Sequence, residues 1–506
     1  MGRRQIAKNT FFLYVRILVT IVVSLYTSRV ILQVLGAEDF GIYNVVGGIV
    51  VMFSFLNAAM ATATQRFLTF EIGRNNRNEI QRIFSMSLII YVLMALVIFV
   101  LGESVGLYLF YQLNIPGERL DAALITYHIT IFTFIFSVVR IPFHALIIAK
   151  EKMGVYAIIC IIETFSRLGI LYVIQMIQFD SLVLYAFFLL LISILITLVY
   201  VRYCRVHYIE SKYILFWDRQ MFFMLTSYAG WNLFGNIAFI AATQGINIVL
   251  NVFFGPIVNA ARGVAFQVQA AVKNFVANFQ LAVDPQIIKS YANNELNYCN
   301  DLIYSASKYS FFLLYLLVVP LLYRIEYIME LWLENVPEYT VIFCKLILVN
   351  ALIDAVSGPL STSAQATGKI KLYQFIVGSV LLLNLPIAYL VLYWGGSPQS
   401  TVYVSIIISI VLILLRVFIL DKFLHVIKIS RFIYRVILPV FAVVFPTLLI
   451  LSFLVRYVPD GTLGGMVLVL LMTAIVNLVV IFLTGLSISE KRFVIQSIQS
   501  VLKKNM

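Results

Sequence analysis

Basic residues inside long apolar stretches are the most unusual chemical feature of this sequence. Two carboxylates, Glu163 and Asp354, are assigned to the same stretches, which gives an expected excess of seven positive charges. A cation at the centre of a bilayer costs about 3 kcal/mol or more, so these side chains need a partner or water. Arginine and lysine also bind phosphate groups. The nine bases are Arg16, Arg29, Arg66, Arg140, Arg167, Arg262, Lys273, Lys345 and Arg416.

Six of these bases are our candidate substrate-binding residues: Arg29, Arg66, Arg140, Arg262, Lys273 and Arg416. For the bases near the ends of a stretch, the alternative is that the long side chain reaches the lipid head groups. Arg140 lies two residues before Pro142, whose missing backbone donor predicts a kink. Glu163 and Arg167 are four residues apart on one helical face, and this spacing favours a structural ion pair.

Polar residues also follow one face of two predicted helices. At about 100° per residue, Arg262, Gln269, Lys273 and Gln280 form a narrow stripe on residues 255–283. We interpret such stripes as the lining of a water-filled lumen. The candidate lumen residues are Asn232, Asn236, Asn247, Gln269 and Gln280.

Two alternatives to the lumen remain open. The asparagines could form hydrogen bonds between helices, each worth about 1 kcal/mol. Lys273 could form an interhelical ion pair with Asp354. Because Asp354 is one of the carboxylates at membrane depth, it is also our candidate for coupling transport to an ion.

Enzyme and metal-site motifs are absent from the sequence. It contains no GxxxxGK[ST], HExxH or GxSxG motif and no paired aspartates for a metal-bound sugar nucleotide. The four cysteines and four histidines are scattered, and this spacing disfavours a zinc-type cluster. We therefore expect no catalytic residues, no metal and no cofactor, although H⁺ or Na⁺ could serve as a coupling ion.

The composition identifies the elements that carry these residues. Of 506 residues, 62% are apolar and 12% are charged, about half the roughly 25% charged residues usual in soluble domains. The apolar runs are continuous rather than alternating, which excludes β-barrel strands. We predict an all-α polytopic membrane protein with about fourteen transmembrane helices, over residues 11–35, 40–70, 83–111, 122–149, 153–177, 181–203, 221–252, 255–283, 302–323, 340–367, 372–394, 401–420, 432–455 and 461–485.

These helices divide into two lobes of six and a final pair. The predicted boundaries are 1–205, 206–425 and 426–488, followed by an amphipathic cytoplasmic tail at 489–506. One set of alternate connections, with the termini, holds 24 lysines and arginines, and the other set holds three. By the positive-inside rule, both termini are cytoplasmic.

The two lobes show signs of a duplication. A displacement of 219 positions places Gly36 on Gly255 and Asn75 on Asn294. Because the displacement spans an even number of predicted helices, it keeps the topology. The halves are therefore predicted to be parallel repeats.

Three segments resemble the multidrug/oligosaccharidyl-lipid/polysaccharide exporter (MOP) superfamily, and within it the Wzx-type polysaccharide flippases. They are "SRVILQVLGAEDFGIYNVVGGI", "ATQRFLTFEIGRNN" and "GPLSTSAQATGKIKLYQF". The resemblance implies a V-shaped, MATE-like protein of the bacterial cytoplasmic (inner) membrane that works by alternating access. It implies export of an undecaprenyl-diphosphate-linked oligosaccharide for lipopolysaccharide, O-antigen or capsule synthesis.

The same resemblance suggests partners and alternatives. Membrane lipids and a polysaccharide polymerase or glycosyltransferases are expected partners, and nucleic acid is not. The alternatives are a MATE-type multidrug/cation antiporter or a lipid-linked peptidoglycan-precursor flippase. The cationic interior disfavours the antiporter, because cation exporters need acidic groups. A membrane polysaccharide polymerase or ligase is less favoured, because the sequence predicts no long outward loop.

Overall fold

The computed structural model describes residues 2–51, 54–111, 115–333, 336–459, 462–492 and 495. Helices make up 88% of the structure, and the described residues contain no strand. The predicted all-α fold is confirmed. Most of the predicted amphipathic tail at 489–506 lies outside the described residues.

The helices follow the predicted stretches closely. In the first half they are α1 (Gly2–Val51), α2 (Ser54–Gly73), α3 (Arg77–Leu101), α4 (Leu107–Phe110), α5 (Leu120–Val139), α6 (Ile141–Ala149), α7 (Met153–Ile174) and α8 (Ser181–His207). They continue with α9 (Arg219–Phe254), α10 (Pro256–Ala292), α11 (Leu296–Trp332), α12 (Thr340–Ala355), α13 (Gly358–Thr367), α14 (Ile370–Leu382), α15 (Asn384–Tyr393) and α16 (Ser400–Lys422). The last are α17 (Ile429–Phe432), α18 (Leu438–Leu454) and α19 (Leu463–Val480).

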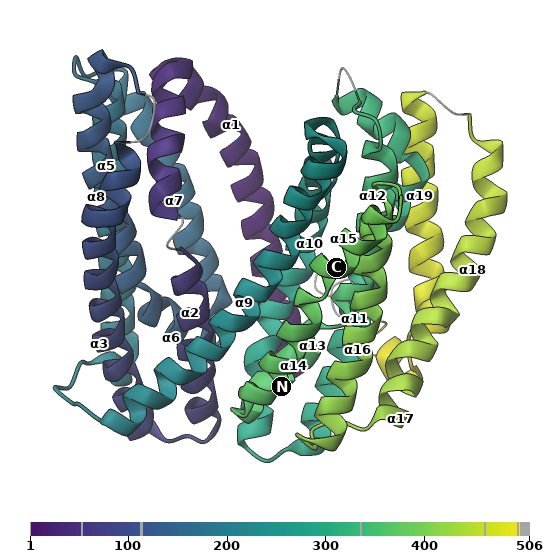
Figure 1. The fold of residues 1–506 in the computed structure, drawn as a ribbon. Coiled ribbons are helices and arrows are strands. Elements are labelled where there is room, and N and C mark those ends of the chain that lie inside the picture. The colour runs from purple at the N-terminus through teal and green to yellow at the C-terminus, as the bar shows by residue number, and fades with distance from the viewer. Residues whose placement is uncertain are drawn as a thin grey trace, which may run out of the picture. The chain divides into compact units, whose positions relative to one another are not determined.

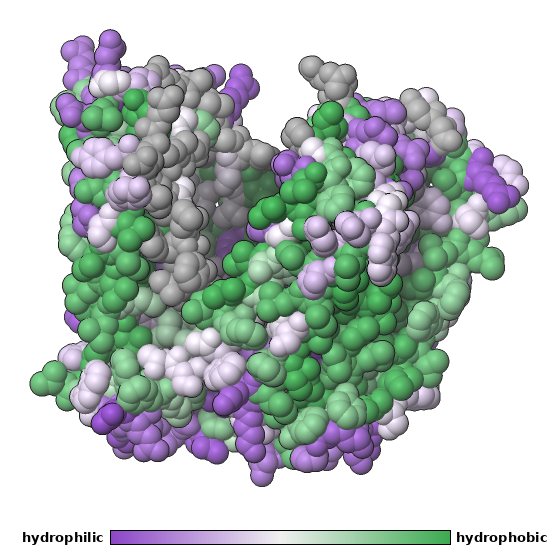
Figure 2. Space-filling view, viewed as in Figure 1, coloured by the Kyte–Doolittle hydropathy of each residue, from purple (hydrophilic) through white to green (hydrophobic). Residues whose placement is uncertain are grey.

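Twelve helical segments among the described residues are long and apolar enough to cross a membrane. They correspond to twelve of the fourteen predicted stretches. The other two stretches, 40–70 and 255–283, are also helical, in α1 with α2 and in α10. These helices carry Arg66 and the Arg262 stripe, and such polar residues lower their hydropathy. In Figure 2 apolar side chains cover the middle of each unit's visible face, and hydrophilic ones gather towards its ends.

The chain forms two compact units. Unit 1 comprises Met1–Asn236 and Ile288–Glu295, and unit 2 comprises Ile237–Ile287 and Leu296–Met506. Helices α9 and α10 therefore each contribute to both units. The predicted boundaries at 205 and 425 remain predictions.

Each unit has its own apolar core. In unit 1, buried residues of α1, α5, α7 and α8 form one cluster, with Val46, Tyr127 and Leu171 fully buried. These helices run beside one another in Figure 1. Because lipid supplies little hydrophobic drive, packing and interhelical hydrogen bonds must hold them together. Ser193 and Thr197 of α8 donate such bonds to the backbone carbonyls of Thr133 (3.2 Å) and Phe136 (3.4 Å) on α5.

The backbone supports the predicted duplication. Gly36 and Gly255, which the displacement of 219 superposes, both have positive φ, at 76° and 78°. Asn75 and Asn294, also superposed, have φ of 56° and 63°. Left-handed backbone is uncommon outside glycine and is tolerated best by Asn and Asp. Gly36 lies at a kink within α1, Gly255 separates α9 from α10, and Asn75 and Asn294 follow the ends of α2 and α10. Equivalent positions of the two halves therefore share the same backbone turns.

Candidate functional site

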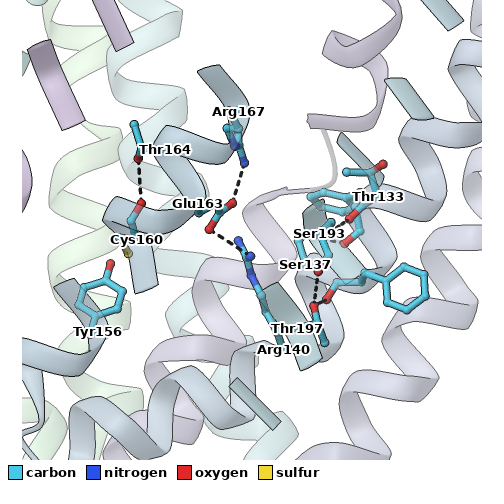
Figure 3. Close-up of polar contacts among 12 residues, drawn as sticks. Thr133, Ser137, Arg140, Tyr156, Cys160, Glu163, Thr164, Arg167, Ser193 and Thr197 are labelled. Atoms are coloured by element: carbon cyan, nitrogen blue, oxygen red, sulfur yellow. Dashed lines mark hydrogen bonds and ion pairs between the residues drawn. The ribbon is translucent and has the colours of Figure 1, made fainter. Parts of the chain in front are cut away.

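Glu163 lies at the middle of α7 and contacts two arginines. Its Oε1 accepts a hydrogen bond from Arg167 at 2.8 Å, and its Oε2 accepts one from Arg140 at 3.3 Å. Figure 3 shows both guanidinium groups pointing to this carboxylate. The predicted pair of Glu163 and Arg167 is confirmed, but a second arginine joins it.

The break between α5 and α6 positions Arg140. Helix α5 ends at Val139, Arg140 follows as a turn residue, and Pro142 occupies the first turn of α6. Proline fits there because the first-turn N–H groups have no helical acceptor. The predicted kink is confirmed. It places Arg140 opposite α7, 23 positions before Glu163 in the sequence.

Two cavities of unit 1 meet at Glu163 and Arg167. We call them cavity A, of about 400 Å³, and cavity B, of about 530 Å³. Arg140 lines cavity A and Arg16 lines cavity B, while Glu163 and Arg167 line both. Together these four side chains carry three positive charges and one negative charge. We call them the arginine site.

Arg16 is held on the wall of cavity B by α7. It donates a hydrogen bond to the Tyr156 hydroxyl at 2.5 Å, and its guanidinium lies 4.8 Å from the centre of the Tyr156 ring. Arg16 was not among our candidate substrate-binding residues. Arg167 was not among them either, because its i, i+4 spacing from Glu163 favours a structural ion pair.

Serine and threonine side chains make up much of the remaining wall. In cavity A, Thr130, Thr133 and Ser137 donate their hydroxyl protons to carbonyls of their own helix, at 2.6–2.9 Å. In cavity B, Thr20, Thr27 and Thr164 do the same at 2.7–3.0 Å. A hydroxyl that donates to the backbone keeps its lone pairs free. These walls therefore present acceptors beside the cationic arginine site.

The polar stripe of α10 lies in unit 2, where its members contact neighbouring helices. Lys273 forms an ion pair with Asp354 of α12 at 3.3 Å, which is the alternative left open by the sequence. Gln269 donates to the Ile347 carbonyl at 3.3 Å, and Gln280 to the Ser310 hydroxyl at 3.1 Å. Thus Gln269, Lys273 and Gln280 contact α11 and α12, whereas Arg262 contacts α9.

Arg262 is a buried cation with neutral partners. Its side chain is 4% exposed, and it donates to the Asn247 side chain and to the Thr243 carbonyl. Its guanidinium lies 4.6 Å from the centre of the Phe266 ring. Among the described residues, no carboxylate forms an ion pair with it. Neutral hydrogen bonds and a ring leave its positive charge uncompensated.

The other candidate residues do not line cavity A or cavity B. Arg66 is buried against the rings of Phe67 and Phe70, 4.6 Å from each ring centre. Arg29 is exposed on α1 and Arg416 is half-buried on α16. Asn232 is buried and Asn236 half-buried, both on α9 within unit 1. Their binding roles remain predictions.

The count of embedded carboxylates needs a correction. Glu103 also falls within the predicted stretch 83–111, so the stretches hold three carboxylates rather than two. Arg202, Lys308 and Arg435 likewise fall within predicted stretches, which makes twelve bases and an excess of nine positive charges. Glu103 lies in a π-helical turn, Gly102–Gly106, and contacts the His128 ring nitrogen at 2.9 Å. The polar sequence GESVG interrupts an otherwise apolar run, and this signal could have revealed it.

Further groups in the described structure do not add a metal site. No group of three or more His, Cys, Asp or Glu side chains among the described residues could hold a metal ion. A third cavity, cavity C of about 520 Å³, lies in unit 2. Arg324, Arg456, Glu326 and Glu330 line it and balance in charge. The arginine site is therefore more cationic than cavity C.

Comparison with known proteins identifies the fold. No protein-family model and no curated protein matches the chain. A multidrug resistance MATE family transporter of the MOP superfamily, in an outward-facing conformation, matches with a TM-score of 0.71 and 12% identity, over 82% of this chain and 94% of that one. MATE in the straight conformation gives 0.69 and 14% identity, over 82% and 95%.

A third solved structure is similar to the same extent. It is a MOP superfamily transporter from Pyrococcus furiosus, whose binding pocket is described as having reverse polarity. Its TM-score is 0.70 and its identity 13%, over 83% of this chain and 97% of that one. These neighbours are transporters, not enzymes. The chain therefore has the fold of the MATE transporters of the MOP superfamily and is a multi-pass membrane protein.

Proposed function

We propose that the protein is an exporter with alternating access whose substrate carries an anionic diphosphate head group and a glycan. An undecaprenyl-diphosphate-linked oligosaccharide is the substrate class that fits best. The observation that carries the proposal is the arginine site, where three arginines face cavities A and B with one carboxylate.

The charge of the arginine site supports an anion. Its net charge is two positive, and a diphosphate that links a lipid to a sugar carries about two negative charges. Charge-assisted hydrogen bonds from arginine to phosphate are short and strong, and two can form in parallel. A bound anion would also offset the free-energy cost of keeping these cations at membrane depth.

The walls of cavities A and B support a sugar-bearing substrate. The hydroxyls of Thr130, Thr133 and Thr164 use their protons on the helix backbone, so their oxygens can accept. A glycan offers many O–H donors, whereas a phosphate offers none when fully ionised. The arginines would thus bind the phosphates, and the hydroxyl oxygens would accept hydrogen bonds from the sugar.

A MATE-type multidrug/cation antiporter is the second candidate. The similarity in fold favours it, because two of the neighbours described above are named MATE and one of them a multidrug resistance transporter. The charge of the arginine site opposes it, because a cation would meet three arginines. The Pyrococcus furiosus transporter, described with a pocket of reverse polarity, is a precedent within this fold for a different pocket charge.

The setting of the protein belongs to the same proposal. We place it in the bacterial cytoplasmic membrane, as the resemblance to the Wzx-type flippases implies. Both termini are proposed to lie in the cytoplasm, because of the 24-to-3 distribution of basic residues in the connections. Glycosyltransferases that build the lipid-linked glycan, and a polymerase that uses it, are the partners such a reaction needs. Any coupling ion would be H⁺ or Na⁺, with Asp354 as one candidate carboxylate.

Two hosts distinguish the candidates. In a host that lacks its own polysaccharide flippase, the wild-type protein should restore surface polysaccharide, and Arg140→Gln should not, at equal membrane levels of protein. In a host that lacks drug efflux pumps, the same protein should leave ethidium accumulation unchanged. Ethidium export without restored polysaccharide would refute the proposal and establish the antiporter. Because hosts differ in their glycans, several flippase-deleted hosts are needed before a negative result counts.

A further inference from the structure

The single carboxylate of the arginine site, Glu163, lies in the walls of the two cavities that the proposed substrate would occupy. Glu163 lines both cavities, and it is the only described carboxylate among the residues that line either. Both of its oxygens are engaged, one by Arg167 and one by Arg140, so the group is fixed on the wall. Its side chain is 14% exposed, whereas that of Arg167 is 54% exposed. A ligand that binds the arginines therefore approaches a fixed negative charge.

Among the described residues that line cavities A and B, none supplies a second carboxylate. The charged and titratable groups that share these walls with Glu163 are Arg16, Tyr43, Arg140, Cys160, Arg167 and Tyr185. Among these described residues, the permanent charges are the three arginines. Removal of Glu163 would therefore raise the net charge of the arginine site from two to three.

Two forms of a lipid carrier differ in charge at this point. A diphosphate that joins the lipid to a sugar is a diester, with one charge on each phosphate. The carrier without its glycan is a monoester, and its terminal phosphate gains a second charge above a pKa of about 6. The free carrier thus brings about three negative charges, where the loaded carrier brings two.

We propose that Glu163 is the specificity-determining residue of the arginine site, which selects the glycan-linked diphosphate diester and rejects the free carrier diphosphate. This inference rests on the proposed function. The penalty for removing a ligand's charge from water grows faster than the charge itself, whereas the attraction of a fixed site grows in proportion to it. A site of net charge two therefore favours the diester, and a site of net charge three moves the preference towards the monoester.

Repulsion by Glu163 works in the same direction. The extra charge of the free carrier lies on the terminal phosphate, beside the position that the sugar would occupy. Like charges that meet in a binding site reject the wrong ligand more strongly than the right one. The loaded carrier would be exported, and the empty carrier would not compete for the same cavities.

The test compares two ligands that differ in one methyl group. Geranyl diphosphate is the monoester, and its terminal methyl ester is the matching diester. Their affinities are measured by isothermal titration calorimetry on the purified full-length protein at pH 8. We expect the wild type to bind the methyl ester more tightly. In Glu163→Gln, the ratio of the two affinities should shift by about tenfold towards geranyl diphosphate.

Two further variants make the test decisive. Glu103→Gln removes a carboxylate of unit 1 that lines neither cavity, and it should leave the ratio as in the wild type. The double variant Glu163→Gln/Arg167→Gln returns the net charge to two, so its preference for the methyl ester should be restored at lower affinity. If Glu163→Gln alone does not fold, the double variant still tests the proposal. Loss of its preference for the methyl ester would then contradict the proposal.

The outcomes separate this inference from the proposed function. If the wild type binds neither ligand, the proposed function itself fails. If it binds both but Glu163→Gln keeps the wild-type ratio, Glu163 does not determine specificity, while the anion site remains. An equal shift in Glu103→Gln would show a general effect of net charge and would also overturn the inference.

Discussion

Arg140 donates a hydrogen bond across 3.3 Å to Glu163, although the two residues belong to different helices and lie 23 positions apart. Arg140 lies at the break between α5 and α6, two residues before Pro142. The contact joins the wall of cavity A to that of cavity B.

Arg140→Ala should reduce transport by at least about tenfold, since a hydrogen bond to a charged group is worth about 1.5–3 kcal/mol. Arg140→Lys should keep part of the activity, because charge remains but the two-pronged geometry is lost. Surface polysaccharide in the flippase-deleted host measures the effect. Arg202→Ala, at an exposed position of α8, is the control and should behave as wild type. Full activity of Arg140→Ala would remove Arg140 from the site.

The pair of Lys273 and Asp354 should contribute little to stability. Their side chains are 36% and 31% exposed, and pairs of this kind contribute about 1 kcal/mol or less. A double-mutant cycle with Lys273→Ala and Asp354→Ala, followed by thermal unfolding in detergent, gives the interaction energy. A value of about 3 kcal/mol or more, typical of a buried pair, would contradict this expectation. If the interaction energy is about 1 kcal/mol or less, a loss of transport in Asp354→Asn would indicate that Asp354 couples transport to an ion.

The pair of Lys308 and Glu490 should make stability depend on acid pH. Burial alone would raise the pKa of Glu490, but hydrogen bonds from Lys308 and the Ser487 N–H outweigh it and lower the pKa below 4.5. The stability that Glu490 contributes is therefore present above its unfolded pKa and is lost as the pH falls through its folded pKa. Unfolding temperatures should decrease between pH 5 and pH 3 in the wild type, and less steeply in Glu490→Gln.

The same pair provides a test at neutral pH. Lys308 and Glu490 are 6% and 9% exposed, so Glu490→Gln leaves a buried cation and should cost about 3–5 kcal/mol. Asp301→Asn breaks a pair with Arg435 in which both side chains are 51% exposed, and it should have little effect. Equal effects of the two variants would show that burial does not matter here.

Arg119 should hold together one end of unit 1. It bonds to Asp39 and to Asp180, each at a shortest distance of 2.5 Å. Asp180 also accepts hydrogen bonds from the first N–H groups of α8, at 3.0 and 3.1 Å. Arg119→Lys cannot reach both carboxylates in this way, so its unfolding temperature should fall almost as far as that of Arg119→Ala. If the lysine variant matched the wild type, the paired geometry would be unimportant.

The sequence predicts the helices well because bilayer thickness sets their length and composition. The break at Gly36 and its repetition at Gly255 are also visible in the sequence, as glycines between predicted stretches that the displacement of 219 superposes. Pro142 predicts the interruption beside Arg140, because proline cannot donate to the helix. These features depend on neighbouring residues alone.

Contacts between distant helices could not be predicted in this way. The i, i+4 spacing of Glu163 and Arg167 predicts their pair, but nothing local indicates that Arg140 joins it. Arg16 reaches Tyr156 across 140 positions. The sequence suggests Asp354 as a partner for Lys273, because few charged residues lie in the apolar stretches. Charge counting alone could not decide whether Lys273 pairs with Asp354 or faces a water-filled lumen. Glu103 was missed although the polar sequence GESVG interrupts the apolar run around it.

Transport by the purified protein tests the central claim most directly. The protein is reconstituted into liposomes with a fluorescent diphosphate-linked glycolipid, and a membrane-impermeant quencher reports movement between leaflets. The account predicts that the wild type moves the glycolipid, that Arg140→Gln and Arg167→Gln do not, and that a cationic dye is not transported. Transport of the dye without movement of the glycolipid would contradict the claim that the arginine site serves an anionic substrate.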